Sequence, residues 1–361
     1  MITEEILSAF DIAGKLKSCD PIGNGLINTT YRADFESGSY IIQRINNSVF
    51  KDVDALMKNI CGVTSFLSKK IAQDGGNPMR QTLNVICTKD GKPYFTCSNG
   101  FYWRCYNYIS DTYVRDSAES PEDMYACALA FSKFQRLLSD YPVNELSETI
   151  PDFHNTPDRC AQLMQAVRAD LCGRLAEVRL QVSFVIARAG ELSYFTDRLA
   201  SGKIPLRITH NDTKLNNVLF DSNTGDALCV VDLDTVMPGA VAYDFGDAVR
   251  SGAATLNEDS LSPEDSRLDL NRFEMFTKGF LEGCGKCLCD EEINSLVWGA
   301  KLMTLECGIR FLTDYLNGDV YFKTTRKGHN LSRARSQFAL VTDMENKWYD
   351  MISVVEKYKN A

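Results

Sequence analysis

The stretch ITHNDTKLNNVLF, residues 208–220, places one histidine, one aspartate and three asparagines between two apolar edges. Burying polar groups costs free energy unless each finds a partner, so the cluster is either a hydrogen-bonded turn or a functional site. Asp212 follows His210 by two residues, and Asn217 follows Asp212 by five. Beyond them, the apolar segment LCVV leads to Asp232. The chemistry that this spacing permits decides between the two interpretations.

The pattern supplies, one after another, the residue types that phosphoryl transfer from ATP needs. One carboxylate orients the acceptor hydroxyl and accepts its proton, while carboxylate and amide oxygens hold Mg²⁺ against the phosphates. The pattern predicts Asp212 as the catalytic base and Asn217 and Asp232 as magnesium ligands. Asp234 is predicted either as a further metal ligand or as a residue that holds a ligand in place. A simple turn would explain His210 with Asp212, but not the spaced asparagine and the aspartate after a strand.

A second string, YDFGD at 243–247, has the letters of a protein-kinase motif in a different place. Asp244 follows a Pro-Gly turn, whereas Asp232 ends a strand and lies closer to Asp212 in the sequence. We therefore assign the metal to Asp232. Asp244 is expected to begin the next helix and to hydrogen-bond the loop around Asp212 from below.

The segment IGNGLINTTY, residues 22–31, fits a hairpin that covers phosphates. Gly23 and Gly25 allow close approach of the backbone, but Asn28 stands where a third glycine would be, and an ordinary glycine turn explains the segment equally well. The strand 40–45, YIIQRI, carries two long polar side chains, Gln43 and Arg44. Strand alternation lets one of these two face a nucleotide, and the sequence leaves open which.

In the first third of the chain, apolar residues mostly follow the alternating pattern of strands, and further along they follow the three- and four-residue spacing of helices. The resulting expectation is an α+β fold with a small sheet-rich lobe at 1–110 and a larger helical lobe at 111–361. The predicted elements are two hairpins (29–35 with 40–45, and 82–89 with 93–97 across Asp90-Gly91), a strand at 101–109, a strand pair around 217–221 and 226–232, and helices at 52–71, 121–138, within 160–200 and over most of 262–361.

Composition excludes several classes of function. The chain has 361 residues, 44% of them hydrophobic, and a formal net charge of -9. Nucleic acids and anionic membranes need a basic surface, which this charge disfavours. No signal peptide or apolar run of membrane-spanning length is recognisable, and most of the thirteen cysteines are scattered singly. The group Cys284, Cys287 and Cys289 lacks the second ligand pair of a zinc site, so we expect a cytoplasmic protein with reduced thiols.

Several segments together resemble the aminoglycoside-phosphotransferase and choline-kinase type of small-molecule kinase, and within it the N-acetylhexosamine 1-kinases. The similarity extends over about residues 20–345, and the segments that carry it are GLINTTY (25–31), FHNTPDR (153–159), THNDTKLNN (209–217), VVDLDTVMPG (230–239), YDFGD (243–247) and ECGIRFLTDYLNGDVYF (306–322).

The resemblance implies a two-lobed protein-kinase-like fold that binds ATP and Mg²⁺. The adenine would lie against residues 106–109 and the phosphates under residues 23–30. The implied nucleotide-binding residues are Gly25, Asn28, Thr29, Arg44, Tyr106 and Tyr108. The implied reaction moves the γ-phosphate to the anomeric hydroxyl of N-acetylglucosamine (GlcNAc) or N-acetylgalactosamine (GalNAc). This hydroxyl is more acidic than that of an ordinary alcohol, so one carboxylate is an adequate acceptor for its proton.

The predicted sugar-binding residues lie in the helical lobe. Glu306, Arg310 and Asp314 are spaced four apart and share one helix face, which is typical of a solvated salt-bridge ladder. The segment is otherwise apolar, so Arg310 is expected to be buried and paired or to face a ligand. The resemblance favours Arg310, Tyr321 and Asp314, together with Asp212, as sugar contacts. His154 is interpreted as a capping or packing histidine.

Two rival functions stay open from the sequence. A kinase of the same fold could act on homoserine, choline or an aminoglycoside, and the acidic charge suits a cationic acceptor. A catalytically dead nucleotide-binding protein is disfavoured because Asp212, Asn217 and Asp232 are all present.

Overall fold

The computed structural model describes residues 2–23 and 28–359. The chain forms two compact units, and neither is continuous in sequence. The first contains 1–113, 140–151 and 219–238, and the second contains 114–139, 152–218 and 239–361. Sheets dominate the first unit and helices the second, which confirms the α+β class.

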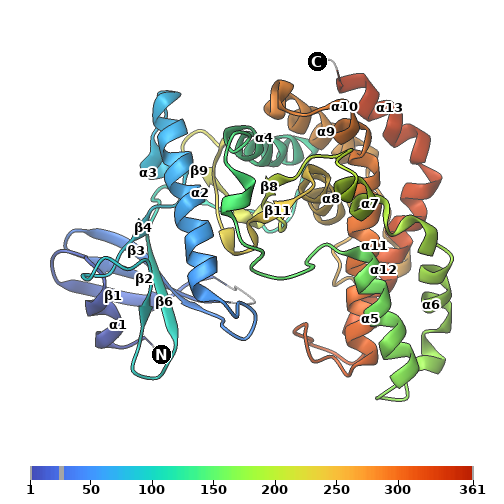
Figure 1. Cartoon of the computed structure of the whole chain (residues 1–361), viewed down its shortest axis with the longest axis horizontal. Coiled ribbons are helices and arrows are strands. Elements are labelled where there is room, and N and C mark those ends of the chain that lie inside the picture. The colour runs from blue at the N-terminus through green and yellow to red at the C-terminus, as the bar shows by residue number, and fades with distance from the viewer. Residues whose placement is uncertain (1, 24–27, 360–361) are drawn as a thin grey trace. The chain divides into compact units, whose positions relative to one another are not determined.

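The first unit contains an antiparallel sheet, visible in blue to teal in Figure 1. Its strand order is β1-β2-β3-β6-β4, and β5 also pairs with β6. The predicted hairpin of β2 and β3 is confirmed, because Phe35 pairs with Gly38 and Asp34 with Ser39 across the turn. The strands are β1 Leu16–Pro21, β2 Thr29–Phe35, β3 Gly38–Ile45, β4 Val85–Ile86, β5 Phe95–Thr96 and β6 Tyr102–Asn107.

The predicted second hairpin is wrong. β4 and β5 do not pair with each other, because both pair antiparallel with the longer strand β6. Ile86 pairs with Cys105, and Phe95 pairs with Trp103. Strands of two residues gain little from mutual pairing, whereas β6 offers each of them part of a long edge.

Apolar side chains on one face of this sheet form the core of the unit with the first helix, α1 (Glu4–Ala9). The predicted helix at 52–71 is α2, Val53–Gln73, whose first turn is capped by Asp52 accepting from the backbone N–H of Ala55 at 2.9 Å. Helix α3, Pro78–Gln81, follows. The buried members of the core cluster are Ile6, Phe10, Ala33, Phe35, Ile42, Cys97, Trp103 and Cys105.

Later segments complete the first unit. β9 (Val218–Asp221) and β10 (Ala227–Val230) form the predicted strand pair, and β7 (Thr112–Tyr113) joins them in the order β10-β9-β7. Asn59 of α2 links the two later segments of this unit, 140–151 and 219–238. Its amide nitrogen donates to the carbonyl oxygens of Ser147 at 2.8 Å and Val236 at 3.1 Å. The residues that carry Asp232 are thereby fixed to the same unit as the sheet.

The second unit is built of helices that approach one another closely. A Cβ atom at Gly246 would lie 2.2 Å from the carbonyl oxygen of Gly299, so α8 and α11 touch backbone to backbone. Another close approach joins α4 to α9, where a Cβ at Gly279 would lie 2.7 Å from the carbonyl oxygen of Tyr125. The helices are α4 Pro121–Leu137, α5 Thr156–Ala169, α6 Arg179–Ile186, α7 Tyr194–Ala200, α8 Val241–Gly252, α9 Leu270–Cys284, α10 Asp290–Asn294, α11 Leu296–Leu316, α12 His329–Asn346 and α13 Trp348–Tyr358.

Short elements connect these parts. Two strands of three residues, β8 Arg207–Thr209 and β11 Met237–Gly239, flank the segments that carry the predicted catalytic residues.

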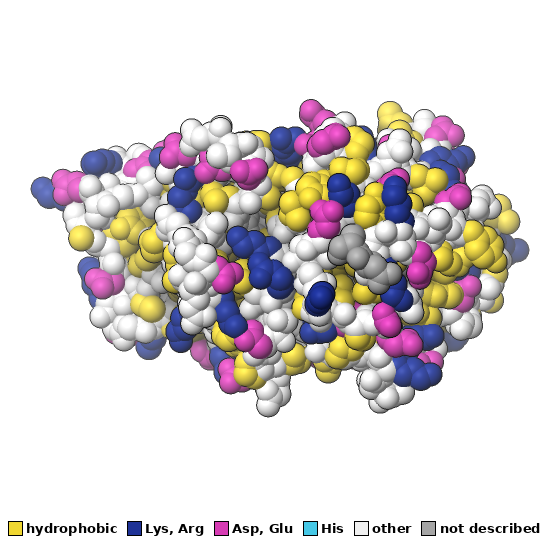
Figure 2. Space-filling view, turned by 90° about the horizontal axis from the view of Figure 1, so that it is seen from above, with side chains coloured by type: hydrophobic (Ala, Val, Ile, Leu, Met, Phe, Trp, Pro, Cys, Tyr) yellow, Lys and Arg dark blue, Asp and Glu magenta, His cyan; other side chains and the backbone are white. Residues whose placement is uncertain are grey.

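None of the described helices is both long and apolar enough to cross a bilayer. Figure 2 shows acidic and basic side chains interspersed over one face of the molecule. The 3-10 turns are Val143–Glu145, Leu175–Glu177, Ala189–Glu191, Leu215–Asn217, Leu233–Thr235, Pro263–Asp265 and Gly285–Cys287.

Candidate active site

The spaced asparagine of the loop after β8 holds the aspartate. Asn217 Nδ2 donates to the backbone oxygen of Asp212 at 2.8 Å and to its Oδ2 at 3.0 Å. The Asp212 side chain stays 31% exposed. The amide nitrogen of Asn217 makes both bonds, and its amide oxygen accepts no hydrogen bond from the described residues, so this oxygen can bind something else. The five-residue spacing therefore places a fixed carboxylate, that of Asp212, beside an amide oxygen, that of Asn217, which can serve as a metal ligand.

A lysine neutralises this carboxylate. Lys214 Nζ lies 2.9 Å from Asp212 Oδ1. Burial tends to raise the pKa of Asp212, but Lys214 and His210 more than offset it, so the pKa lies below the ordinary value of 3.8. The same carboxylate raises the pKa of Lys214. Asp212 is thus ionised at neutral pH, as a proton acceptor must be.

The loop rests on two aspartates of α8. Asp244 is fully buried and accepts the backbone N–H of His210 at 2.9 Å and of Asn211 at 2.7 Å. Asp247 Oδ2 accepts the backbone N–H of Thr213 at 2.9 Å, and its Oδ1 is paired with Arg250 at 2.7 Å. Asp244 is predicted to begin the next helix, and the structure places it in the first turn of α8, which begins at Val241. The predicted hydrogen bonds from Asp244 to the loop are confirmed.

His210 acts within this loop as a buried acceptor and packing group. Its ring makes edge contacts with Phe131 and Phe134, at centroid distances of 5.4 and 6.0 Å. Its Nδ1 accepts the backbone N–H of Asp212 at 3.3 Å. The histidine therefore helps to set the backbone from which the Asp212 carboxylate projects.

In the first unit, Asp232 and Asp234 follow strand β10. The backbone is left-handed at Asp232, with φ 59°. Asp234 is 3% exposed, and both of its carboxylate oxygens are occupied. Arg104 Nη1 of β6 donates to Oδ1, and Asn28 Nδ2 donates to Oδ2 at 2.6 Å. Because both oxygens are engaged, Asp234 is better suited to holding neighbouring side chains in position than to binding a metal directly.

The strand pairing separates Gln43 from Arg44. Gln43 lies opposite Arg104 in the register, and its Oε1 accepts from Arg104 Nε at 3.0 Å and Nη2 at 2.9 Å. The guanidinium of Arg44 instead lies over the ring of Phe101, 4.8 Å from the centroid. Gln43 thus shares a side-chain cluster with Asp234, and Arg44 contacts a different part of the unit.

The other predicted nucleotide-binding residues are spread over the first unit. Gly25 lies outside the described residues. Thr29 is exposed at the start of β2, and Tyr106 is buried on β6 with an exposed fraction of 3%. The ring of Tyr108 lies under the guanidinium of Arg32 at 4.3 Å. Their contact with a nucleotide stays a prediction.

In the second unit, the guanidinium of Arg310 is surrounded by aromatic rings. Its Cζ atom lies 5.3 Å from the ring centroid of Phe153, 5.5 Å from that of Phe322 and 6.0 Å from that of Tyr321. Among the described residues, no hydrogen-bond acceptor or carboxylate pairs with it. A partly buried guanidinium of this kind has all five N–H donors available for a ligand.

Asp314, one turn further along α11, fixes the neighbouring loop. Its carboxylate accepts the backbone N–H groups of Val320, Tyr321 and Phe322 at 2.8 to 2.9 Å, together with the side-chain amide of Asn330 at 2.8 Å. The structure thus gives Asp314 internal partners, through which it positions Tyr321. Tyr321 is itself 58% exposed.

His154 and Glu306 form a pair beside Arg310. His154 Nδ1 lies 2.8 Å from Glu306 Oε1, and Thr156 Oγ1 donates to Glu306 Oε2 at 2.6 Å. The His154 side chain is 10% exposed, and its Nε2 has no hydrogen-bond partner within the part of the chain that the structure describes. Burial tends to raise the pKa of Glu306, but His154, Thr156 and Arg310 lower it overall. A buried, unpaired polar atom here fits contact with a polar ligand.

Sequence reasoning missed several of these residues. One of them is Lys214, which lies within the motif itself. Arg104 stands in an aromatic strand, FYWRCYNYI, and a charge in a buried strand is a signal that a partner exists. No local signal pairs His154 with Glu306, because the two lie 152 residues apart in the sequence.

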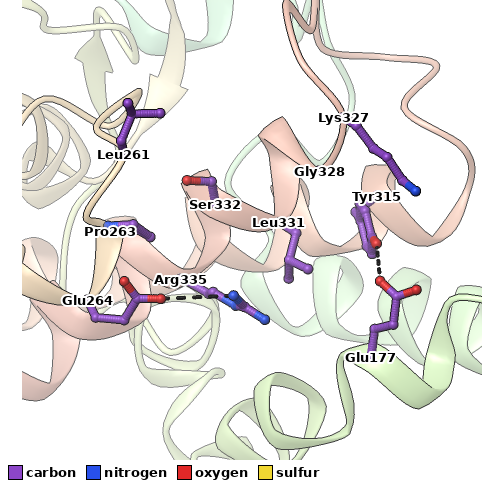
Figure 3. Close-up of a pocket in the computed structure, with 10 residues that line it drawn as sticks. All are labelled: Glu177, Leu261, Pro263, Glu264, Tyr315, Lys327, Gly328, Leu331, Ser332 and Arg335. Carbon is purple, nitrogen blue, oxygen red and sulfur yellow. Dashed lines mark hydrogen bonds and ion pairs between the residues drawn. The ribbon is translucent and has the colours of Figure 1, made fainter.

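The cavity drawn in Figure 3 contains none of the predicted site residues. It has a volume of about 420 Å³ and lies in the second unit. Its polar groups partly satisfy one another, since Tyr315 donates to Glu177 at 2.7 Å and Arg335 lies 3.9 Å from Glu264. The described residues also contain no group of three or more His, Cys, Asp or Glu side chains arranged around a metal position.

Comparison with known proteins identifies the family. The model of the "Phosphotransferase enzyme family" matches residues 18–264. The fold is similar to an aminoglycoside phosphotransferase from Alicyclobacillus acidocaldarius (TM-score 0.64, 14% identity, covering 100% of this chain and 97% of that one). It is also similar to a spectinomycin phosphotransferase solved with ADP and spectinomycin (TM-score 0.56, 13% identity, covering 92% of this chain and 93% of that one). A third similar structure is choline kinase from Cryptosporidium parvum (TM-score 0.57, 11% identity, covering 96% of this chain and 93% of that one). With the family model matching well over half of its residues, the chain belongs to the phosphotransferase enzyme family.

Proposed function

We propose that this phosphotransferase moves the γ-phosphoryl group of ATP to the anomeric hydroxyl of an N-acetylhexosamine, GlcNAc or GalNAc. The products are the sugar 1-phosphate and ADP. The observation that carries the proposal is the Arg310 guanidinium, set among three aromatic rings without a polar partner among the described residues. Such a group can donate to sugar ring and acetamide oxygens while the rings pack on the sugar's apolar face.

Asp212 is the proton acceptor of the proposed reaction. Its ionised carboxylate accepts the proton of the anomeric hydroxyl as the sugar oxygen bonds to the γ-phosphorus and the bond to ADP breaks. Asn217 holds the carboxylate from one side and Lys214 from the other. This orientation is what allows a single carboxylate to serve as base.

The oxygen donors of the chain fit a magnesium ion, which usually binds through one or two carboxylates and the substrate phosphates. We propose the Asn217 amide oxygen and the Asp232 carboxylate as its ligands. Magnesium would neutralise charge that develops on the transferred phosphoryl group. Asp234 is the less suitable ligand, because Arg104 and Asn28 already occupy its oxygens.

The proposed acceptor site combines Arg310 and Tyr321 with the buried Nε2 of His154. Asp314 contributes by holding the loop that carries Tyr321. An acetamide oxygen is a suitable acceptor for the Arg310 guanidinium, and a sugar hydroxyl or the acetamide N–H can donate to His154 Nε2, because Nδ1 is the nitrogen that faces the Glu306 carboxylate. Without such a ligand, His154 Nε2 stays buried and has no partner among the described residues, which costs free energy.

A cationic acceptor, such as choline or an aminoglycoside, is the second candidate because the chain is acidic. The arginines of this cluster disfavour it. Burial lowers the pKa of Arg159, and the nearby charge of Arg310 lowers it further, so two guanidinium groups already repel each other here. A further cation would add to that repulsion.

The test is ADP release with ATP and magnesium over a panel of acceptors. The panel contains GlcNAc, GalNAc, 1-O-methyl-GlcNAc, homoserine, choline and kanamycin. Turnover with the free sugars that disappears with the 1-O-methyl compound is the expected result, because that compound has no anomeric hydroxyl. Turnover only with choline, homoserine or kanamycin would reject the sugar site and retain the kinase.

A further inference from the structure

The first unit contains a charged cluster around Arg104. The Arg104 side chain is 1% exposed, and three of its five N–H groups are used. Nε and Nη2 donate to Gln43 Oε1, and Nη1 donates to Asp234 Oδ1. The other two N–H groups have no hydrogen-bond partner within residues 2–23 and 28–359 and can bind another anion.

Gln43 is oriented as an acceptor for this arginine. Its Nε2 donates to Thr30 Oγ1 at 2.9 Å, which turns Oε1 towards Arg104. A lysine at position 43 would place a second cation opposite Arg104 in the β3–β6 register. The two positions can therefore hold one positive charge between them, and in this chain the charge comes from β6.

The cluster includes Asn28, a described residue of the stretch that is predicted to cover the phosphates. Asn28, within 23–30, donates to Asp234 Oδ2 at 2.6 Å and accepts the backbone N–H of Asn46 at 3.0 Å. Burial tends to lower the pKa of Arg104, but the charges of Asp234 and Asp232 raise it overall. A permanent positive charge thus shares the Asp234 carboxylate with Asn28, a residue of the stretch that is predicted to cover the phosphates.

We infer that Arg104 pairs with the phosphates of the nucleotide, as a cation supplied by β6, with Gln43 as its positioning residue and Asp234 as its counter-ion. Arg44 has no part in this, because its guanidinium lies over Phe101. The inference rests on the proposed use of ATP and is independent of the acceptor. A phosphate anion would compete with Asp234 for the guanidinium, whose planar donors suit phosphate oxygens.

The test compares binding of ADP and of adenosine, by titration calorimetry of the full chain with magnesium. Arg104→Gln is expected to weaken ADP binding about 10- to 100-fold, the effect of a hydrogen bond between charged groups, and to leave adenosine binding within about twofold. Lys92→Gln, which removes an exposed charge from the same unit, should change neither.

A second variant guards against misfolding, because Arg104→Gln leaves Asp234 buried without its ion pair. Gln43→Lys/Arg104→Gln moves the positive charge across the strand pair and keeps a cation near Asp234. This double variant is expected to bind ADP within about tenfold of the wild type.

Three results would overturn the inference. They are equal weakening of ADP and adenosine binding in both variants, unchanged ADP affinity in Arg104→Gln, and a larger loss of ADP affinity in Arg44→Gln than in Arg104→Gln. A wild-type chain that binds neither ADP nor ATP would overturn the proposed use of ATP as well, so the two failures are distinguishable.

Discussion

Asn217 donates from one amide nitrogen to both the backbone oxygen and the carboxylate of Asp212, at 2.8 and 3.0 Å. The contact fixes the direction of a carboxylate that is still partly exposed to solvent. The carboxylate is the base of this pair, and the amide that holds it is a neutral hydrogen-bonding group.

Asp212→Asn is expected to lower kcat about 10²- to 10⁴-fold, because it removes the proton acceptor and keeps the side-chain volume. Steady-state ADP release measures the loss. The ADP affinity of Asp212→Asn should stay close to that of the wild type. The control Asp116→Asn, at an exposed residue, should keep the activity of the wild type. Activity that survives in Asp212→Asn would assign the base to another residue.

The lysine partner of this carboxylate predicts a pH effect. The pKa of Asp212 in the folded protein lies below its ordinary value, so the ionised base is present above that pKa and is lost as the pH falls through it. Lys214→Gln removes the strongest influence that lowers this pKa. The acidic limb of the kcat profile, measured between about pH 4 and pH 8, is expected to shift to higher pH. An unshifted limb would separate Lys214 from the titration of the base.

Asp244 is predicted to matter for stability more than for chemistry. Asp244→Ala leaves the buried backbone N–H groups of His210 and Asn211 without their acceptor. The free energy of unfolding, measured with urea, should fall by about 2–6 kcal/mol, since each of the two unpaired buried donors costs about 1–3 kcal/mol. The matched exposed variant Asp116→Ala should change it by less than about 0.5 kcal/mol. Equal effects of the two substitutions would refute the supporting role.

Features that depend on neighbouring residues could be predicted from the sequence. The β2–β3 hairpin and helix α2 follow from a turn and from helical spacing, and the support of the loop by Asp244 follows from its place after a Pro-Gly turn. The false second hairpin shows the limit of this reasoning. Alternation within 82–97 is compatible with mutual pairing, and only the competing edge of β6 decides against it.

The polar clusters could not be predicted, because their members are far apart in the sequence. Arg104 lies 61 residues from Gln43 and 130 from Asp234. Spacing of four residues correctly placed Arg310 and Asp314 on α11, but it could not show that Asp314 binds a backbone loop while Arg310 lacks a polar partner among the described residues. Such partners are determined by tertiary packing.

Arg310→Met tests the acceptor site. Methionine keeps most of the apolar contact with Phe153 and Phe322, but it removes every donor of the guanidinium. The KM for GlcNAc is expected to rise about 10- to 100-fold, with the KM for ATP changed by less than about threefold, because hydrogen bonds from a charged group contribute about 1.5–3 kcal/mol. Arg267→Met, at a side chain that is 47% exposed, is the matched control and should leave both constants unchanged. If the KM for ATP rises instead, Arg310 belongs to the nucleotide site and the proposed sugar contact is wrong.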